Sequence, residues 1–518
     1  MSHAELLIGL LLAIAVLAGL ARLIGVPYPV VLVLGGLAIG LIPGVPHVRV
    51  NPDLILLVFL PPLLYSAAFL LSAGELRAHA RSIFLLAIGL VVVTMVIVAA
   101  AAHQFADLDW PQAFVLGAAV GATDPIAATS VLERLGAPRR ISTILEGESL
   151  VNDGTAFVAY KIAVGAVGTA TFSPPGAVGQ FVLVSVGGAA VGLAVGWFSA
   201  RIRQAFDDAR IEITVSLLTP FAAYIPAVQL GLSGVLAAVA AGLYVGARSM
   251  WIFSAETRLR YYAFWEVLAF LLNSLLFLLI GIELRAVLSD LQSASAWALV
   301  ADAALLCVIV LGVRLIWMFV VTPIADVLPG VPAARSWRER LVLGWSAMRG
   351  GLTLAAALAI PLDVPDRDRL VFLIYVVIIG TLVPPGLTLP ALIRKLGVGS
   401  GERDATVRYS AEIRAELARA ALARLEDIED AHLASDEAAA QARAQYDLRL
   451  RRAEAILEGD EPATDELRGY RRLRSELIEA ERAALADIRH RGRVPDAVVR
   501  AIERELDLEE ARLRGQGA

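Results

Sequence analysis

Cysteine is nearly absent from this chain, which has one among its 518 residues, Cys307. A single cysteine excludes both an internal disulfide framework and a cysteine-based metal site. The six histidines fall at predicted helix ends, in loops and in the C-terminal tail, so they predict no metal site within the apolar part. The motifs H-E-x-x-H and G-x-S-x-G and the P-loop are missing as well. We therefore expect no enzyme, no ATP-driven pump, no cofactor and no nucleic-acid partner.

Charge is also scarce, because only 18% of the residues are charged and 58% are hydrophobic, with a mean hydropathy of +0.70. Such a composition is too apolar for a soluble protein of this length and predicts many membrane spans. About half of all charged residues lie in residues 401–518. This last segment is rich in Ala, Arg, Glu and Leu and poor in Gly and Pro, which predicts helices. We expect a membrane domain over 1–397 and a cytosolic helical domain over 398–518.

Long apolar runs dominate the first 400 residues and lack the strict alternation of barrel strands, so they predict transmembrane helices. A helical span needs roughly 17–25 mostly apolar residues. This window predicts an all-α polytopic membrane protein with about 13 spans. The predicted spans are 4–21, 28–43, 53–73, 82–103, 111–132, 141–167, 177–200, 211–227, 232–247, 261–283, 295–325, 340–361 and 370–393.

The basic residues between these spans predict the orientation of the chain, because cytoplasmic connections carry an excess of Lys and Arg. With the N-terminus outside, most of the basic residues in connections fall inside. Those that fall outside are Arg49, Arg285, Arg367 and Arg369. We therefore expect a protein of the cell (inner) membrane whose N-terminus is outside and whose tail is cytoplasmic.

Three polar clusters interrupt the predicted spans, at residues 121–125, 145–155 and 348–351. A charged group at the bilayer centre costs at least ~2.5–3.5 kcal/mol, so such clusters indicate function. At ~1.5 Å per residue in a hydrocarbon core of ~30 Å, Asp124, Asp153 and Arg349 all lie near the midplane. We expect the clusters to meet and to bind a small cation in exchange for protons.

The fifth and twelfth spans are each expected to be broken, by Thr-Asp-Pro and by Arg-Gly-Gly. Pro125 lacks an N–H and its ring clashes with the carbonyl four residues earlier, so the helix should open there. The twelfth span comes seven spans after the fifth. Because seven is odd, these two spans cross the membrane in opposite directions, so the two halves of the domain would be inverted repeats. Broken helices at matching positions of inverted repeats indicate the binding site of a transporter. The topology alone suggests this symmetry, since the residues show no convincing repeat.

Asp153 is the main candidate for ion binding and proton exchange, because a carboxylate removed from bulk water can hold either a proton or a cation. Ser149 lies one helical turn earlier and Thr123 lies at the break, so both can offer oxygen ligands to Na⁺. Asp124 is expected to stabilise the exposed helix dipoles or Asn152. The alternative for Asp153 is a buried carboxylate that only pairs across helices.

A structural ion pair is expected between Glu148 and Arg349, because a guanidinium at the midplane needs a carboxylate. Arg314 shares a predicted span with Asp302, so pairing with Asp302 or reaching the interface accounts for it. Glu146 has no assigned role.

Five segments resemble the sodium/proton antiporter (exchanger) branch of the monovalent cation:proton antiporter family. They are Phe-Leu-Pro-Pro-Leu-Leu-Tyr at 59–65, Ala-Thr-Asp-Pro at 122–125, Glu-Gly-Glu-Ser-Leu-Val-Asn-Asp-Gly-Thr-Ala at 146–156, Phe-Leu-Leu-Asn-Ser-Leu-Leu-Phe at 270–277 and Gly-Trp-Ser-Ala-Met-Arg-Gly-Gly at 344–351. The resemblance covers roughly 1–397, and the Asn-Asp segment is its most specific part.

The resemblance implies a homodimer of thirteen-span protomers, each with a dimerisation domain and a moving core domain. It implies that Asp153 binds the ion and exchanges the proton, with Thr123, Asp124 and Ser149 at the ion site. It also implies that Glu148 and Arg349 form the internal ion pair. Asn152 fills the position that accompanies electroneutral one-for-one exchange in the family.

One departure from the family concerns the cation. Many relatives carry an acidic residue just after Leu-Pro-Pro, where this chain has Ser66 and Ala67. The sequence therefore leaves Na⁺ (or Li⁺)/H⁺ exchange and K⁺/H⁺ or broad cation exchange both open. A gated cation channel or membrane sensor that uses the carboxylates statically is the alternative from another class.

Overall fold

The computed structural model describes residues 3–42, 55–169, 174–206, 208–290, 296–323, 336–399, 402–431, 433–459, 461–490 and 496–515. These residues form helices and short connections without a β-strand, apart from one isolated antiparallel bridge. The chain divides into two compact units, Met1–Val398 and Gly399–Ala518. Each unit is described here by itself.

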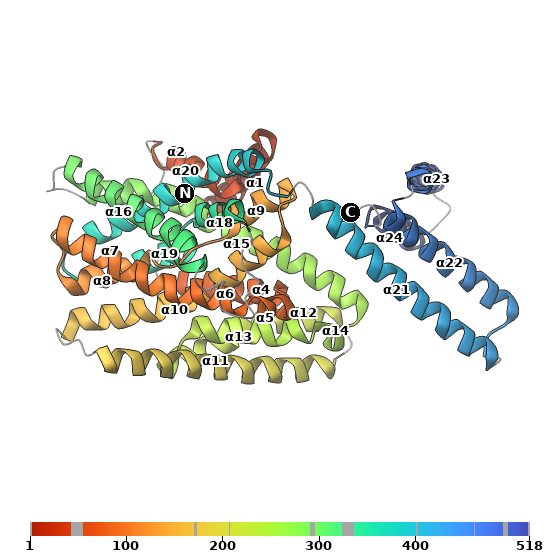
Figure 1. The fold of residues 1–518 in the computed structure, drawn as a ribbon, viewed down its shortest axis with the longest axis horizontal. Coiled ribbons are helices and arrows are strands. Elements are labelled where there is room, and N and C mark those ends of the chain that lie inside the picture. Colours follow the sequence, from red (N-terminus) through yellow and green to blue (C-terminus); the bar gives the residue numbers. More distant parts are fainter. Residues whose placement is uncertain are drawn as a thin grey trace. The chain divides into compact units, whose positions relative to one another are not determined.

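The helices of the first unit are shown in Figure 1. In chain order they are α1 (His3–Ile24), α2 (Tyr28–Gly40), η1 (Ile55–Phe59), α4 (Leu60–Leu70), α5 (Ala73–Ala78), α6 (Ala80–Phe84), η2 (Leu85–Leu90), α7 (Val91–Phe105), α8 (Trp110–Ala119), α9 (Ile126–Leu135), α10 (Arg139–Thr169), α11 (Pro174–Gln204), α12 (Ala209–Gln229), α13 (Gly234–Ala247), α14 (Ser249–Ile252), α15 (Ala255–Asp290), α16 (Ala296–Ile316), η3 (Trp317–Val321), α18 (Trp337–Trp345), α19 (Gly351–Leu358) and α20 (Arg367–Leu396).

Seven of the described helices or helix runs are long and apolar enough to cross a membrane, and three further apolar helices are shorter. The protein is thus an integral membrane protein built of helices, as the composition predicts. The ends of the second, third and eleventh predicted spans include residues 43, 53–54, 295 and 324–325, which lie outside the described residues. The predicted breaks in the fifth and twelfth spans are confirmed, because each of these spans consists of two helices.

The long helices form two sets of close neighbours, here called groups, which also contact each other, for example through α10 on α11 and α15 on α20. In the first group, α2 packs on α15 and α13 packs on both α4 and α11, and Figure 1 shows α11 and α13 lying along each other. In the second group, α8 packs on α7 and α10, and α16 packs on α7 and α20. The polar clusters predicted from the sequence all lie on the second group, at α8–α10 and α18–α19.

Glycine allows the closest helix contact in the first group. A Cβ at Gly281 of α15 would collide with the carbonyl oxygen of Val33 in α2, and a Cβ at Gly36 would collide with the carbonyl oxygen of Leu278. Without a hydrophobic driving force between helices in lipid, such close backbone packing is a main source of helix association. The pair α2–α15 therefore depends on small residues at these two positions.

We predict that Gly281→Ala destabilises the protein by about 1–3 kcal/mol, because the added methyl group forces α2 and α15 apart. Thermal or denaturant unfolding of the purified protein in detergent measures this. Gly312→Ala on α16 is the matched control, because a Cβ there has no neighbour within 4 Å. Its expected effect is neutral or slightly stabilising, since Ala is the better helix former. Equal stability of the two variants against unfolding would contradict the close packing of α2 and α15.

The second unit contains four helices: α21 (Glu402–Asp430), α22 (Asp436–Glu458), α23 (Glu461–His490) and α24 (Asp496–Gly515). α21 packs on α22, and α23 packs on α24 through a small buried cluster that includes Ile478 and Val499. Ion pairs such as Arg419–Glu454, at 2.8 Å, are largely exposed and contribute little stability. The predicted helical character of this segment is confirmed.

Candidate ion-binding site

The two broken helices cross each other at their breaks. The first break separates α8 from α9, and the second separates α18 from α19. At the crossing, the backbone N–H of Asp124 donates a hydrogen bond to the carbonyl oxygen of Met348 at 2.7 Å, which forms the isolated antiparallel bridge. Residues more than 200 positions apart in sequence thus meet, as the shared depth of the clusters predicts.

The carboxylate of Asp124 lies at the start of both half-helices that follow the breaks. Its Oδ1 accepts a hydrogen bond from the N–H of Ile126, the first residue of α9, at 3.0 Å. The N–H of Gly351, the first residue of α19, also donates to this carboxyl group. A side chain at Gly350 would collide with the Asp124 carboxylate, so only glycine fits there. One negative charge therefore stabilises two helix N-termini, where unpaired N–H groups and the positive dipole ends are found.

A chain of buried polar side chains connects the first break to α10. The Nδ2 of Asn152 donates to the hydroxyl of Thr123 at 2.6 Å, and that hydroxyl donates to Oε1 of Glu148 at 3.3 Å. Asn152 is fully buried, and its Oδ1 has no hydrogen-bond partner in the described part of the chain. The Oδ1 of Asn152 and the hydroxyl oxygen of Thr123 are therefore hard ligand atoms for a cation, and both lie close to the crossing.

Glu148 pairs with Arg314 of α16, not with Arg349, which corrects the prediction made from the sequence. Arg314 contacts both carboxylate oxygens, with Nη2 at 2.8 Å from Oε2 and Nη1 on Oε1, and both side chains are buried. Its Nε and Nη2 also donate to the carbonyl oxygen of Leu343 in α18, at 3.3 and 3.2 Å. The pair therefore joins α10, α16 and α18.

Arg349 binds backbone carbonyls that the two breaks leave unpaired. Its Nε donates to the carbonyl of Val120 at 3.1 Å, and its Nη1 donates to that of Ala347 at 2.9 Å. The charge of Glu148 still acts on Arg349, but no direct ion pair joins them among the described contacts. The sequence argument went wrong because it counted only carboxylates as partners, whereas a broken helix also offers free carbonyl acceptors.

One feature of the sequence points to the true partner of Glu148, namely that Arg314 lies well inside a predicted span. The alternative partner considered for Arg314, Asp302, instead pairs with Arg369 of α20 at 3.1 Å. Asp302 lies 12 residues nearer the start of α16, a little over three turns or about 18 Å along the helix, so the two residues are too far apart to pair.

Asp153 follows Asn152 on α10 and remains partly exposed. No hydrogen bond or ion pair joins its carboxylate to another described residue, although the charge of Asp124 acts on it. Ser149 lies one turn before it and is buried. Three carboxylates thus have different environments here: Asp124 caps two helices, Glu148 is neutralised by Arg314, and Asp153 remains available. Glu146 is partly buried two residues before Glu148 and belongs to none of these contacts.

Comparison with known proteins supports this arrangement. The sequence pattern of the transmembrane domain of sodium/hydrogen exchangers matches residues 10–395. The chain belongs to the sodium/hydrogen exchanger family. It is therefore a member of a transporter family, as the motifs around Asp124 and Asp153 predict.

Several similar proteins carry related names. The Na⁺/H⁺ antiporter NhaH of Halobacillus dabanensis is 34% identical over 75% of this chain and 97% of its own length. An uncharacterized Na⁺/H⁺ exchanger of Mycobacterium tuberculosis is 32% identical over 94% of this chain and 91% of its own length. The solved structure of the sodium proton antiporter MjNhaP1 from Methanocaldococcus jannaschii shares the fold. It has a TM-score of 0.59 at 20% identity and covers 77% of this chain and 98% of that protein.

We predict that the Glu148–Arg314 pair shows strong coupling in a double-mutant cycle. Arg314→Met should destabilise the exchanger by about 3–5 kcal/mol, because it leaves a buried carboxylate uncompensated, and the added change Glu148→Gln should recover part of this loss. Unfolding of the four proteins in detergent measures the coupling.

The same cycle with Arg349→Met should show weaker coupling to Glu148→Gln, because Arg349 binds carbonyl oxygens. A third double-mutant cycle on the partly exposed pair Asp302–Arg369 shows how strongly a less buried ion pair couples in the same protein. Stronger coupling of Glu148 to Arg349 than to Arg314 would contradict the pairing described above.

Proposed function

We propose that this protein exchanges Na⁺ (or Li⁺) for H⁺ across the cell membrane, with both ions competing for Asp153. The observation that carries the proposal is the unpaired carboxylate of Asp153 beside two crossed half-helices, within a unit that matches the sodium/hydrogen exchanger family. A single acid that cannot hold both ions at once is sufficient to couple their movements in opposite directions.

The ligands proposed for the cation are oxygen atoms near Asp153. The carboxylate and the hydroxyls of Ser149 and Thr123 are hard donors of the kind that Na⁺ prefers, and backbone carbonyls and water can complete the shell. Asn152 and Asp124 shape the site: Asn152 holds the Thr123 hydroxyl at 2.6 Å, and Asp124 fixes the crossing. The cation and proton are substrates, and the proposed cycle uses no cofactor.

Exchange requires that the site opens to each side of the membrane in turn. Two sets of closely packed helices, which also contact each other, support such a movement, and the candidate site lies on the group that contains α8–α10 and α16–α20. We propose that this group moves against the group that contains α2, α4, α11, α13 and α15, and that the latter forms the dimer contact of a homodimer. Inverted repeats within the moving group are part of the same proposal, as are an outside N-terminus and a cytoplasmic tail.

The central test is Asp153→Asn. This change removes the charge that binds either ion, so exchange should fall to the background of empty vesicles. The measurement follows proton entry into sealed proteoliposomes with an outward Na⁺ gradient and a clamped membrane potential. Asp302→Asn is the matched control, because Asp302 pairs with Arg369 outside the site, and it should retain most of the activity. Full exchange by Asp153→Asn would refute the proposal.

The cation is tested in the same vesicles by replacing Na⁺ with Li⁺ or K⁺. Proton movement with Na⁺ and Li⁺ but little with K⁺ is the expected result. Ion flow that is not coupled to protons would favour a channel and would refute exchange.

We further propose that exchange is electroneutral, one Na⁺ for one H⁺, because Asn152 adds no second titrating carboxylate beside Asp153. Asn152→Asp supplies one, and we expect the rate of exchange by this variant to depend on the membrane potential. Proteoliposome assays at several imposed potentials measure this. Asn152→Ala is the control, since it also removes the hydrogen bond to Thr123 but adds no charge. Potential-dependent exchange by the unaltered protein would contradict the proposed stoichiometry.

A further inference from the structure

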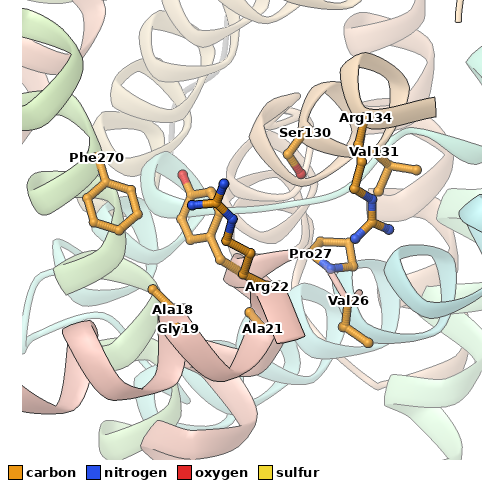
Figure 2. Close-up of a pocket in the computed structure, with 11 residues that line it drawn as sticks. Ala18, Gly19, Ala21, Arg22, Val26, Pro27, Ser130, Val131, Arg134 and Phe270 are labelled. Atoms are coloured by element: carbon orange, nitrogen blue, oxygen red, sulfur yellow. The ribbon is translucent and has the colours of Figure 1, made fainter. Parts of the chain in front are cut away.

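A second polar feature lies at the end of α9, and one residue of its lining, Tyr28, is close enough to the crossing for the charge of Asp124 to act on it. A cavity of about 410 Å³ opens between the end of α1, the start of α2, the end of α9 and α15. Figure 2 shows residues around it, contributed by helices from different parts of the chain. Its volume lies within the range of about 300–1,000 Å³ that is typical of small-molecule sites.

Two arginines line this cavity from different helices. Arg22 lies in the last turn of α1, and Arg134 lies in the last turn of α9. Neither guanidinium has a hydrogen bond or an ion pair with another described residue, and no acidic side chain lines the cavity. The buried Arg314 and the partly buried Arg140 each have a carboxylate partner, Glu148 and Glu339. Arg22 and Arg134 are both exposed, so they place two positive charges without a described carboxylate partner at the rim of one space.

The rest of the lining combines hydroxyl groups with apolar walls. Tyr28 and Ser130 carry hydroxyls, and that of Ser130 donates to the carbonyl oxygen of Ala127 at 2.9 Å. The other lining residues are Ala18, Gly19, Ala21, Val26, Pro27, Val131 and Phe270. Figure 2 shows Ser130 near Arg134 and Phe270 on the side of Arg22. Guanidinium groups match the oxygens of phosphate in geometry and charge. An apolar wall beside them suits a ligand whose charged group is attached to a hydrocarbon part.

The position of the cavity fits such a ligand. Both arginines lie at helix ends, where lipid head groups meet a membrane protein, and basic pockets between transmembrane helices recognise anionic head groups. α1, α2 and α15 belong to one group of packed helices, while α9 follows the break that Asp124 stabilises. A ligand held by both arginines would therefore join the two groups of helices.

We propose that this cavity binds the phosphate group of an anionic ligand, with Arg22 and Arg134 on its oxygens. The phosphate can come from an anionic phospholipid or from a soluble phosphate compound. Both ligands present a phosphate group to the arginines. Only the phospholipid also has a hydrocarbon part that can contact the apolar wall.

The test measures binding to the purified full-length protein in a neutral detergent. Short-chain phosphatidylglycerol is the lipid probe, inorganic phosphate is the soluble probe, and phosphatidylcholine of equal chain length controls for net charge. Phosphatidylglycerol should bind at least about tenfold more tightly to the unaltered protein than to the double variant Arg22→Gln, Arg134→Gln. The double variant Arg22→Lys, Arg134→Lys should retain part of the binding, because it keeps both charges.

Arg210→Gln is the matched control for lost charge, because Arg210 is exposed and lies outside the cavity. It should bind phosphatidylglycerol like the unaltered protein. Equal binding by the Arg22, Arg134 double variant and by Arg210→Gln would overturn the proposal.

A second pair of variants tests the space rather than the charges. Gly19 lines the cavity and a Cβ there has no neighbour within 4 Å, so Gly19→Phe fills the space and keeps both arginines. Gly9→Phe, on the same helix with equal room but outside the cavity, is its control. Binding should fall in Gly19→Phe and persist in Gly9→Phe, whereas unchanged binding in Gly19→Phe would overturn the cavity as the site.

Competition distinguishes the two sources of the phosphate. Displacement of phosphatidylglycerol by inorganic phosphate supports a site that recognises the phosphate group alone. Binding of phosphatidylglycerol that phosphate does not displace supports a lipid that also uses the apolar wall. If neither probe binds, or if phosphatidylcholine binds as tightly as phosphatidylglycerol, the proposal is wrong. Ion exchange is not the readout, so the result is independent of whether the protein exchanges Na⁺ for H⁺.

Discussion

The site depends on one constraint, which is that a helix broken inside an apolar environment exposes backbone groups that must find new partners. An unpaired polar group in hydrocarbon costs several kcal/mol, so irregular backbone persists only where other groups satisfy it. Here each break supplies partners for the other. Asp124 pairs with Met348 through the backbone, and its carboxylate binds the N–H groups at two helix starts. Arg349 binds carbonyls from both breaks. Neither break would be stable alone.

The buried charges around the crossing have separate tasks. Glu148 and Arg314 neutralise each other and connect three helices, and Thr123 and Asn152 extend this connection to the first break. Taking such a pair out of water is costly, so we do not expect the pair to add much net stability. Its role is to hold the three helices in position. Of the three acidic residues Asp124, Glu148 and Asp153, only Asp153 has a carboxylate that no described cation or N–H group holds. A site that must release its ion repeatedly needs an acid without a permanent partner.

The family pattern ends near the boundary of the first unit, at residue 395, and Val398 is the last residue of that unit. Some similar proteins nevertheless extend further. The exchanger of Mycobacterium tuberculosis and an exchanger of Escherichia coli, YjcE, both match over 94% of this chain, whereas NhaH matches over 75%. The chain thus resembles some relatives over nearly its whole length and others over about three quarters of it.

The sequence by itself determined the helical, membrane-embedded character of the chain and the two helix breaks, and it predicted one shared depth for Asp124, Asp153 and Arg349. These features follow from local chemistry, namely apolar run length, the missing N–H of Pro125 and a rise per residue that is constant along a helix. Only the tertiary structure decided which charges pair. Both Arg314 and Arg349 lie inside predicted spans, but the rotation and neighbours of each helix decide which guanidinium faces Glu148. The double role of Asp124 at two helix starts and the cavity around Arg22 and Arg134 were hidden for the same reason, because each joins segments that are distant in sequence.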